Sequence, residues 1–481
     1  MFKSQKGITM TMVIIIIAVI FVFIAIIASN NNNRTTYVAR IGSGEKALMI
    51  AEAGINAYMY HLNQDIEFYR KTEGYHIGGD NASEELGLVP ENAGLPQTYR
   101  TTTYKNNGKT VGYYQIRVVQ PSFNKDLEVL STGWTADNPD IKRTVAVRLQ
   151  KNNYLQYLNF HDSFSTFYNN DKMYGPVFSN QGITTYGNPK FFTDVITAGI
   201  IDSRYGSPTF KGKKLQNQPK MIFPTRDQDI KYLGKTKGLN FQGITCILMQ
   251  NNKLYIRNSM TDNYQVKTYD IPNSGIILVE GGSVFISGVL DGKLTVYCTE
   301  NIYITGRDPT NFSPHYADLT YGIKYKDTKI PEIYESGNNF SSNNFSDDML
   351  GLISEKNIII PTKTWPSDYG LKKYTDPSYA NTYIFVNNME IYAALRAAKN
   401  FIVEDIDTLE NGVTGNLKIK GSKICEESKI SRYLNYASYF DAGYTEENKY
   451  DYRFRITQPP HMVNPADSEW VIISWNEIPN P

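Results

Sequence analysis

The chain is poor in cysteine and has almost no net charge. Its 481 residues contain three cysteines, Cys246, Cys298 and Cys425, which are too few and too scattered for a disulfide framework or a zinc site. Lysine and arginine number 49 against 48 aspartates and glutamates, so the net charge is +1. Dedicated nucleic-acid binders usually carry a clear basic excess. The sequence therefore argues against a specific nucleic-acid partner.

The sequence also lacks the local motifs of common enzymes. None of its five histidines stands in a metal-binding spacing, and neither a nucleophile elbow nor a phosphate-binding loop is present. We therefore expect no catalytic activity, no cofactor and no metal.

One enzyme class escapes a motif search, because glycan-cleaving β-solenoids bring acids together from distant parts of the chain. A pair of carboxylates at the correct separation is sufficient for glycoside cleavage. The candidates are Asp194, Asp202, Asp227 and Asp229. An aspartate beside a turn is more often a turn former, so a membrane-anchored enzyme acting on polysaccharide stays an alternative.

The most informative absence is that of charge from Ile8 to Ala28, a run of twenty-one residues. At about 1.5 Å per residue, a helix of this length reaches roughly 30 Å, the thickness of a bilayer core. The preceding segment, residues 1–7, carries Lys3 and Lys6, and such basic residues favour a cytoplasmic N-terminus with the bulk of the chain outside. A cleaved secretory signal, a plain signal anchor and a processed leader are the three interpretations.

The join Lys6-Gly7-Ile8, a basic leader ending in glycine at the edge of an apolar helix, resembles the prepilin junction of type IV pilins and type II secretion pseudopilins. The resemblance implies that a prepilin peptidase cuts after Gly7 and that the new terminus at Ile8 is methylated. It also implies that the N-terminal helix packs among other pilin subunits. Residues 1–7 are then the leader.

The resemblance departs from the family pattern at Met12, where the fifth mature position usually carries glutamate. In the family that acid is thought to pair with the terminal amine of a neighbouring subunit. A buried charge without its partner is costly, so its absence points to a minor subunit, at the tip of a filament in one interpretation. The other interpretation is that the acid is dispensable here.

Residues 8–72 are predicted to form the transmembrane helix and an amphipathic continuation, because apolar residues recur at steps of three and four after Tyr37. The segment Ala51-Glu52-Ala53-Gly54 resembles a stretch of PilX-like minor pilins at a similar distance from the membrane. Small residues on one face allow close approach of a neighbouring element. A filament contact and an ordinary packed helix are both compatible with it.

Residues 97–151 alternate in polarity, which predicts an antiparallel sheet, with a hairpin turn at Lys105-Asn106-Asn107-Gly108. A long helix packed on such a sheet is the general pilin plan. The sequence of residues 131–134, STGW, also resembles the stretch that comes after the helix in PilX-like proteins. The resemblance covers about the first 150 residues.

Residues 155–450 contain short apolar runs separated by Gly, Asn or Asp, which favour an all-β domain. A right-handed parallel β-solenoid is the leading prediction and a β-sandwich the alternative. The runs GGSVFISG and TENIYITG resemble an uncharacterised β-rich domain behind PilX-like N-termini. Residues 451–481, with the strand-like Trp470–Trp475, are predicted to cap the end of that domain.

The sequence as a whole predicts a minor pilin or pseudopilin-like subunit, made as a single-pass membrane protein and then assembled into a surface filament. Its β domain would present a surface for assembly or for adhesion to a glycan or a cell-surface protein, with exposed tyrosines as a natural lateral surface. A self-associating anchored scaffold is a further alternative.

Overall fold

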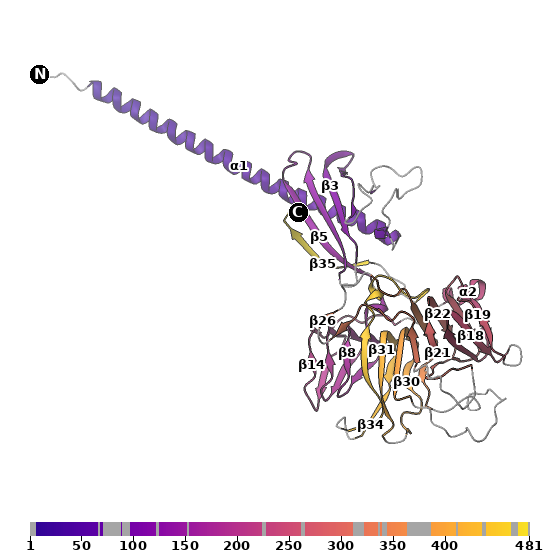
Figure 1. Cartoon of the computed structure of the whole chain (residues 1–481). Coiled ribbons are helices and arrows are strands. Elements are labelled where there is room, and N and C mark those ends of the chain that lie inside the picture. Colours follow the sequence, from indigo (N-terminus) through magenta and orange to yellow (C-terminus); the bar gives the residue numbers. More distant parts are fainter. Residues whose placement is uncertain are drawn as a thin grey trace. The chain divides into compact units, whose positions relative to one another are not determined.

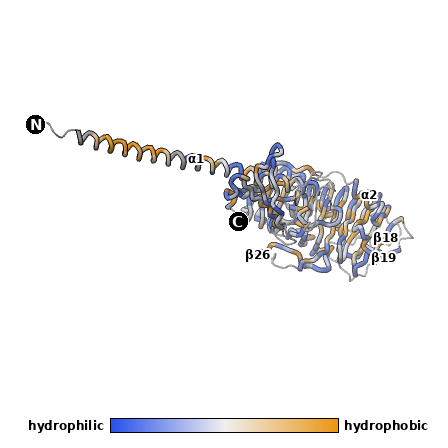
Figure 2. Tube along the Cα trace, turned by 90° about the horizontal axis from the view of Figure 1, so that it is seen from above, coloured by the Kyte–Doolittle hydropathy of each residue, from blue (hydrophilic) through white to orange (hydrophobic). Residues whose placement is uncertain are grey.

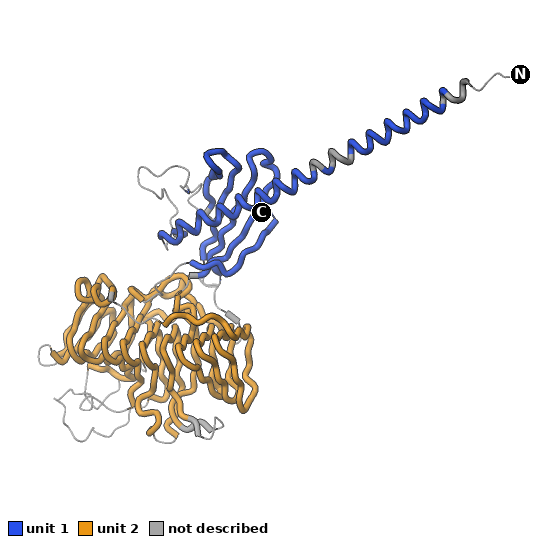
Figure 3. Tube along the Cα trace, turned by 180° about the vertical axis from the view of Figure 1, so that it is seen from behind, with its two compact units in different colours: residues 1–151, 469–481 blue, residues 152–468 orange. Residues whose placement is uncertain are grey.

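The computed structural model of the protein divides into two compact units. Unit 1 comprises residues 1–151 and 469–481, and unit 2 comprises residues 152–468 (Figure 3). The structure describes residues 6–65, 68–70, 88, 97–121, 125–151, 153–223, 228–260, 265–310, 322–334, 337–338, 344–362, 386–409, 412–434, 439–462 and 470–479.

A single helix of 59 residues, α1 (Lys6–Gln64), forms the N-terminal part of unit 1 (Figure 1). It runs unbroken through the polar stretch of residues 30–33, as the sequence predicted. The helix was expected to continue to residue 72, but it ends at Gln64, and a short 3-10 turn, η1 (Phe68–Arg70), lies beyond it.

The rest of unit 1 is an antiparallel sheet on which the second half of α1 packs. Its strands are β1 (Gln97–Thr98), β2 (Thr102–Asn106), β3 (Lys109–Val119), β4 (Leu127–Thr135), β5 (Lys142–Lys151) and β35 (Trp470–Ile478). The predicted hairpin is present: Asn106 pairs with Lys109, and both Asn107 and Gly108 have positive φ, which a tight two-residue hairpin turn requires.

The last strand corrects one prediction. The segment that includes Trp470 was expected to cap the β domain, but β35 pairs antiparallel with β5 and becomes the edge strand of unit 1. Trp470 is buried there and meets the ring of Tyr69 edge to face. Alternation identified the strand, but its partner lies more than 300 residues away, and alternation alone does not specify a partner.

Unit 2 is built from long parallel ladders, together with a few antiparallel additions. One ladder runs, in spatial order, β16 (Leu239–Gln242), β20 (Ile276–Glu280), β22 (Lys293–Cys298), β27 (Met349–Ser354), β29 (Asn388–Ala397), β31 (Thr414–Cys425), β6 (Asn159–His161), β9 (Val177–Ser179), β12 (Val195–Thr197) and β15 (Lys214–Leu215).

Other ladders accompany this one. One contains β17 (Thr245–Gln250), β21 (Val284–Leu290), β23 (Ile302–Ile304), β28 (Ile358–Ile360), β30 (Asn400–Val403) and β32 (Glu427–Lys429). A short one contains β7 (Phe164–Phe167), β10 (Gly182–Tyr186) and β13 (Ile201–Arg204). Another connects β21 and β24 (Gly322–Tyr325) through β29 and β31 to β34 (Tyr439–Tyr450), β8 (Lys172–Tyr174), β11 (Lys190–Phe191) and β14 (Thr209–Phe210).

The antiparallel additions and short helices complete unit 2. They are β18 (Lys253–Asn258), β19 (Lys267–Tyr269), β25 (Ile333–Tyr334), β26 (Gly337–Asn338), β33 (Ser431–Leu434), α2 (Gln228–Lys237) and the 3-10 turns η2 (Tyr154–Gln156) and η5 (Tyr452–Arg455). The fold is therefore an N-terminal helix with an antiparallel sheet, followed by a large β-rich region with parallel and antiparallel pairing.

The order of strands in the ladders does not follow the sequence. Residues 159–215 form a first stack, in which Asn159, Val177 and Val195 stand opposite one another, so that each pass of the chain advances by 18 residues. Residues 239–450 form a second stack. The two stacks join where β6 pairs with β31 and β8 pairs with β34, a junction that we call the seam.

A connecting segment returns the chain from the first stack to the start of the second. Asn180 exchanges two hydrogen bonds with the backbone of Met221, and the ring of Phe223 stacks on Phe160 beside the seam. Farther on, Gly234 of α2 packs against Leu278 of the second stack. The segment thus runs alongside the ladders and covers β20.

The main core of unit 2 is made of aliphatic and aromatic side chains from successive strands. Ile277, Val296, Leu352 and Leu395 come from four neighbouring strands of one ladder and are almost fully buried. Each strand covers the apolar face of the next, which explains the short apolar runs without a ligand.

Candidate functional site

The first half of α1 is apolar and has no partner within the chain. Residues Met12–Ser29 are long and apolar enough to cross a membrane, and none of that window is buried. Figure 2 shows the hydrophobic stretch along the projecting part of α1. Large side chains such as Ile15 and Phe21 are 57% and 67% exposed. Since water disfavours such a surface by roughly 25 cal/mol per Å², this half of the helix requires a membrane or other helices around it.

The predicted processing residues lie at the start of this helix. Lys6, Gly7 and Ile8 form its first turn, whereas Lys3 lies outside the described residues. Met12, the position where the family has an acid, is 62% exposed. Cleavage after Gly7 and the consequence of the missing acid stay predictions.

The second half of α1 touches the sheet through its smallest residues. A Cβ atom on Gly133 of β4 would lie 2.4 Å from the backbone N of Ala51 and 2.4 Å from the backbone O of Ala47. One on Gly54 would lie 2.2 Å from Oγ of Ser131. The helix and β4 therefore approach to a distance that only glycine permits at these points.

The two sequence stretches that carried the resemblance thus pack on each other. Ala51 and Gly54 are buried against β4, and Glu52 and Ala53 between them are half-buried. The packed-helix interpretation of this segment accounts for Ala51 and Gly54. A filament contact through the same residues stays a prediction.

The acids considered for glycan cleavage have other partners or lie apart. Asp194 accepts a hydrogen bond from the backbone N–H of Lys213 at 2.8 Å, which makes it a turn former. Asp202 pairs with Arg204 on the surface at 2.6 Å. Asp229 is exposed on α2, and Asp227 lies outside the described residues. Within the described ranges, no cluster of three His, Cys, Asp or Glu side chains is arranged to hold a metal ion.

The three cysteines are buried and unpaired thiols. Burial raises the pKa of each, Cys246, Cys298 and Cys425, to about 12. A thiolate is the reactive form, so these side chains act as small apolar groups in the stack.

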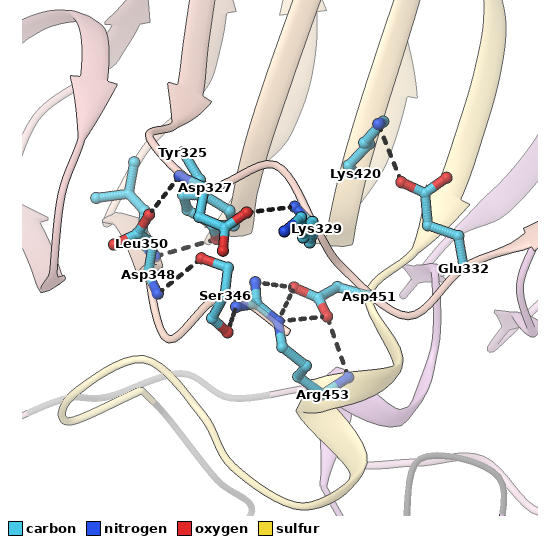
Figure 4. A network of polar contacts seen from close by, with 10 residues as sticks. All are labelled: Tyr325, Asp327, Lys329, Glu332, Ser346, Asp348, Leu350, Lys420, Asp451 and Arg453. Atoms are coloured by element: carbon cyan, nitrogen blue, oxygen red, sulfur yellow. Dashed lines mark hydrogen bonds and ion pairs between the residues drawn. The ribbon is translucent and has the colours of Figure 1, made fainter. Parts of the chain in front are cut away.

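A buried ion-pair network joins the end of the second stack to the loop between β24 and β27 (Figure 4). Asp451 holds the guanidinium of Arg453 with contacts of 2.6 to 3.1 Å, and Arg453 also donates to the backbone O of Ser346. Asp348 in the same loop accepts from the backbone N–H groups of Gly292 and Asp327. The arrangement fixes the chain where it leaves the ladders.

Glu332 forms a second, adjacent part of that network. Its carboxylate pairs with Lys420 at 2.9 Å and with Lys449 at 3.1 Å. Burial alone would raise the pKa of Glu332, but the two lysines bring it below its ordinary value. Sequence reasoning missed both parts, because residues about 100 positions apart gave no local pattern.

A third polar cluster lies at the seam. His161 and Asp171 come from the first stack, and Lys423 and Glu446 come from the second. Burial, together with the nearby Glu446, raises the pKa of Asp171 to about 8. Burial and the charge of Lys423 lower the pKa of His161 well below its ordinary value. The cluster therefore keeps His161 neutral, and Asp171 largely so, at neutral pH.

No family model and no curated protein matches the chain. Among solved structures, the crystal structure of the competence-associated pilin ComZ from Thermus thermophilus aligns with 91% of this chain and 97% of that chain. The sequence identity is 11% and the TM-score is 0.31. At this TM-score the likeness carries no functional argument, and the conclusions below depend on the chain's own residues.

Proposed function

We propose that this chain is a minor pilin or pseudopilin-like subunit that is processed after Gly7 and incorporated in, or at the tip of, a type IV pilus-like filament. The observation that carries the proposal is α1. One continuous helix has an uncovered, charge-free first half and a second half that packs closely on an antiparallel sheet. Such a helix passes from the bilayer into a helical bundle without a change of structure.

The role assigned to unit 2 is to present a β-rich surface outside the cell. We propose that its ladders form a right-handed β-solenoid, since parallel connections are right-handed in nearly all proteins. The proposal assigns no catalytic role to the chain. Its partners would be a prepilin peptidase, other pilin subunits and the membrane.

The surface for adhesion would include a column of tyrosines on the first stack. The rings of Tyr168 and Tyr186 stack 5.5 Å apart, and those of Tyr186 and Tyr205 stack 6.3 Å apart. Tyr205, on the last strand pass, is 71% exposed. An exposed aromatic ring with a polar tip suits a sugar ring or a protein surface.

Processing is tested by changing Gly7 to leucine in the native host. The proposal expects the precursor to accumulate with residues 1–7 attached, because the peptidase requires a small residue before the cut. Gly42→Leu is the matched control, since that position in the same helix has open space around it. Normal maturation of the Gly7 variant would contradict the proposal.

A further inference from the structure

Three side chains with complementary chemistry meet inside unit 2, where β31 lies beside β34. They are an amine, Lys423, a carboxylate, Glu446, and a carboxamide, Asn448. Their exposed fractions are 1%, 5% and 0%. Such groups are rarely buried together unless each has a polar partner, and here the partners are one another.

The geometry places the carboxylate between the two nitrogens. Nζ of Lys423 donates to Oε1 of Glu446 at 2.6 Å, and Nδ2 of Asn448 donates to the same oxygen at 2.8 Å. Oδ1 of Asn448 accepts the backbone N–H of Ile419 at 3.1 Å. That hydrogen bond polarises the carboxamide carbon and is placed to stabilise an oxyanion.

The three roles of an acyl transfer are thus filled by residues of this chain. A nucleophile and a leaving group both contact one general acid–base, and a fixed donor faces the carbonyl oxygen. We propose that Lys423 and Asn448 condense to an intramolecular amide bond, with Glu446 carrying the proton and ammonia leaving.

The atoms balance without any co-reactant. Glu446 first takes a proton from the ammonium of Lys423, and the neutral amine attacks Cγ of Asn448. Glu446 gives that proton to Nδ2, the Cγ–Nδ2 bond breaks and ammonia departs. The nitrogen of the new amide returns one proton to Glu446, which ends as a neutral acid. The N–C bond formed replaces the N–C bond broken, and nothing is oxidised or reduced.

Burial supplies the driving force. Before the reaction the site holds a buried ammonium and a buried carboxylate, whose desolvation costs several kcal/mol per ion. Afterwards both charges have gone. The other groups facing the site are Ser428, which accepts from Nζ of Lys423 at 2.9 Å, and Asp171 and His161 across the seam.

Asp171 is the competing acyl acceptor, but its oxygens are held elsewhere. Oδ2 accepts the backbone N–H of Tyr168 at 2.7 Å, and Oδ1 accepts that of Glu446 at 3.0 Å. The oxygen shared by the amine belongs to Glu446 and leads to Asn448. The geometry therefore favours the carboxamide.

Mass spectrometry of the denatured full-length chain tests the proposal. The expected intact mass is below that calculated from the sequence by one ammonia, about 17 Da. Digestion is expected to yield one branched peptide that joins the segments around Lys423 and Asn448. An intact mass without the loss overturns the proposal. So does a loss that maps to a succinimide at an Asn-Gly step, such as Asn411-Gly412.

Variants separate the roles. Lys423→Arg keeps the cation but cannot condense, and Glu446→Gln keeps the shape but carries no proton, so both should retain the full calculated mass. Asn448→Asp should lose one water, about 18 Da, and give the same branched peptide. Lys420→Arg, on the same strand and paired with Glu332, is the matched control and should still lose ammonia. A water loss in the wild-type chain would assign the bond to Asp171 and refute the assignment to Asn448.

Discussion

In unit 1, the contact between helix and sheet depends on residues with little or no side chain. In unit 2, the ladders depend on large side chains stacked above one another. Gly133 and Ala51 meet backbone to backbone, whereas Ile277 and Leu352 fill the space between strands. The difference teaches that the same kind of substitution has opposite consequences in the two units. Adding atoms should disrupt unit 1, and removing them should disrupt unit 2.

The largest effect is expected from Leu352→Ala, in the middle of the longest ladder. The side chain is fully buried, so its loss leaves a cavity that costs about 4 kcal/mol in the free energy of unfolding of unit 2. Hydrogen exchange measured peptide by peptide on the full chain in detergent should show lost protection in unit 2 only. Ile222→Ala, at an 82% exposed position, is the control. Equal loss of protection in unit 1 would contradict the separation of the units.

The converse change is Gly133→Ala, which adds one methyl group between β4 and α1. Its Cβ would lie 3.0 Å from Cα of Ala51 and closer still to backbone atoms of the helix, so α1 has to move away. We expect a loss of about 2 kcal/mol in unit 1 alone. Gly42→Ala adds the same methyl group to α1 where nothing lies within 4 Å, and it should be neutral or slightly stabilising. If both variants behave alike, close approach does not hold unit 1 together.

A pH titration distinguishes the units by their buried acids. The pKa of Asp171 is about 8 in the fold against an ordinary 3.8, so folded unit 2 retains a proton that the unfolded chain releases. Its contribution to stability is full below pH about 4 and is lost as the pH rises toward about 8. Asp171→Asn should flatten this decline in thermal unfolding of unit 2. A decline that persists unchanged in the variant would assign it to another group.

The smallest effect is expected from the surface of α2. The pair between Lys235 and Glu280, at 3.0 Å, has a lysine that is half exposed, so Lys235→Met should cost about 0.5 kcal/mol or less. Gly234→Ala should cost more, because its Cβ would lie 2.6 Å from Cβ of Leu278. Thermal unfolding of unit 2 compares the two. The reverse order would mean that charge, rather than packing, holds α2 on the ladders.

Much of the fold could be predicted from local patterns in the sequence. The charge-free run predicted the exposed half of α1, and the alternation after Gln97 predicted the sheet of unit 1, including the turn at Asn107 and Gly108. These features depend on neighbours a few residues apart. Periodicity is sufficient for such elements.

The non-local features could not be read from the sequence. The 18-residue spacing of the first stack was missed because aliphatic and aromatic residues replace one another along each column, as Met173, Phe191 and Phe210 do. The seam and the partner of β35 join segments about 250 to 300 residues apart. The cluster of Lys423, Glu446 and Asn448 is likewise produced by the register of β31 and β34, which no single stretch encodes.

The central claim is that α1 begins at a processed terminus and serves in a filament. It is tested most directly by identifying the N-terminal peptide of the protein sheared from the surface of its native host. The account predicts a mature chain that starts at a methylated Ile8 and is recovered together with other filament subunits. Recovery of the chain with Met1 to Gly7 still attached, and only in the membrane fraction, would contradict it.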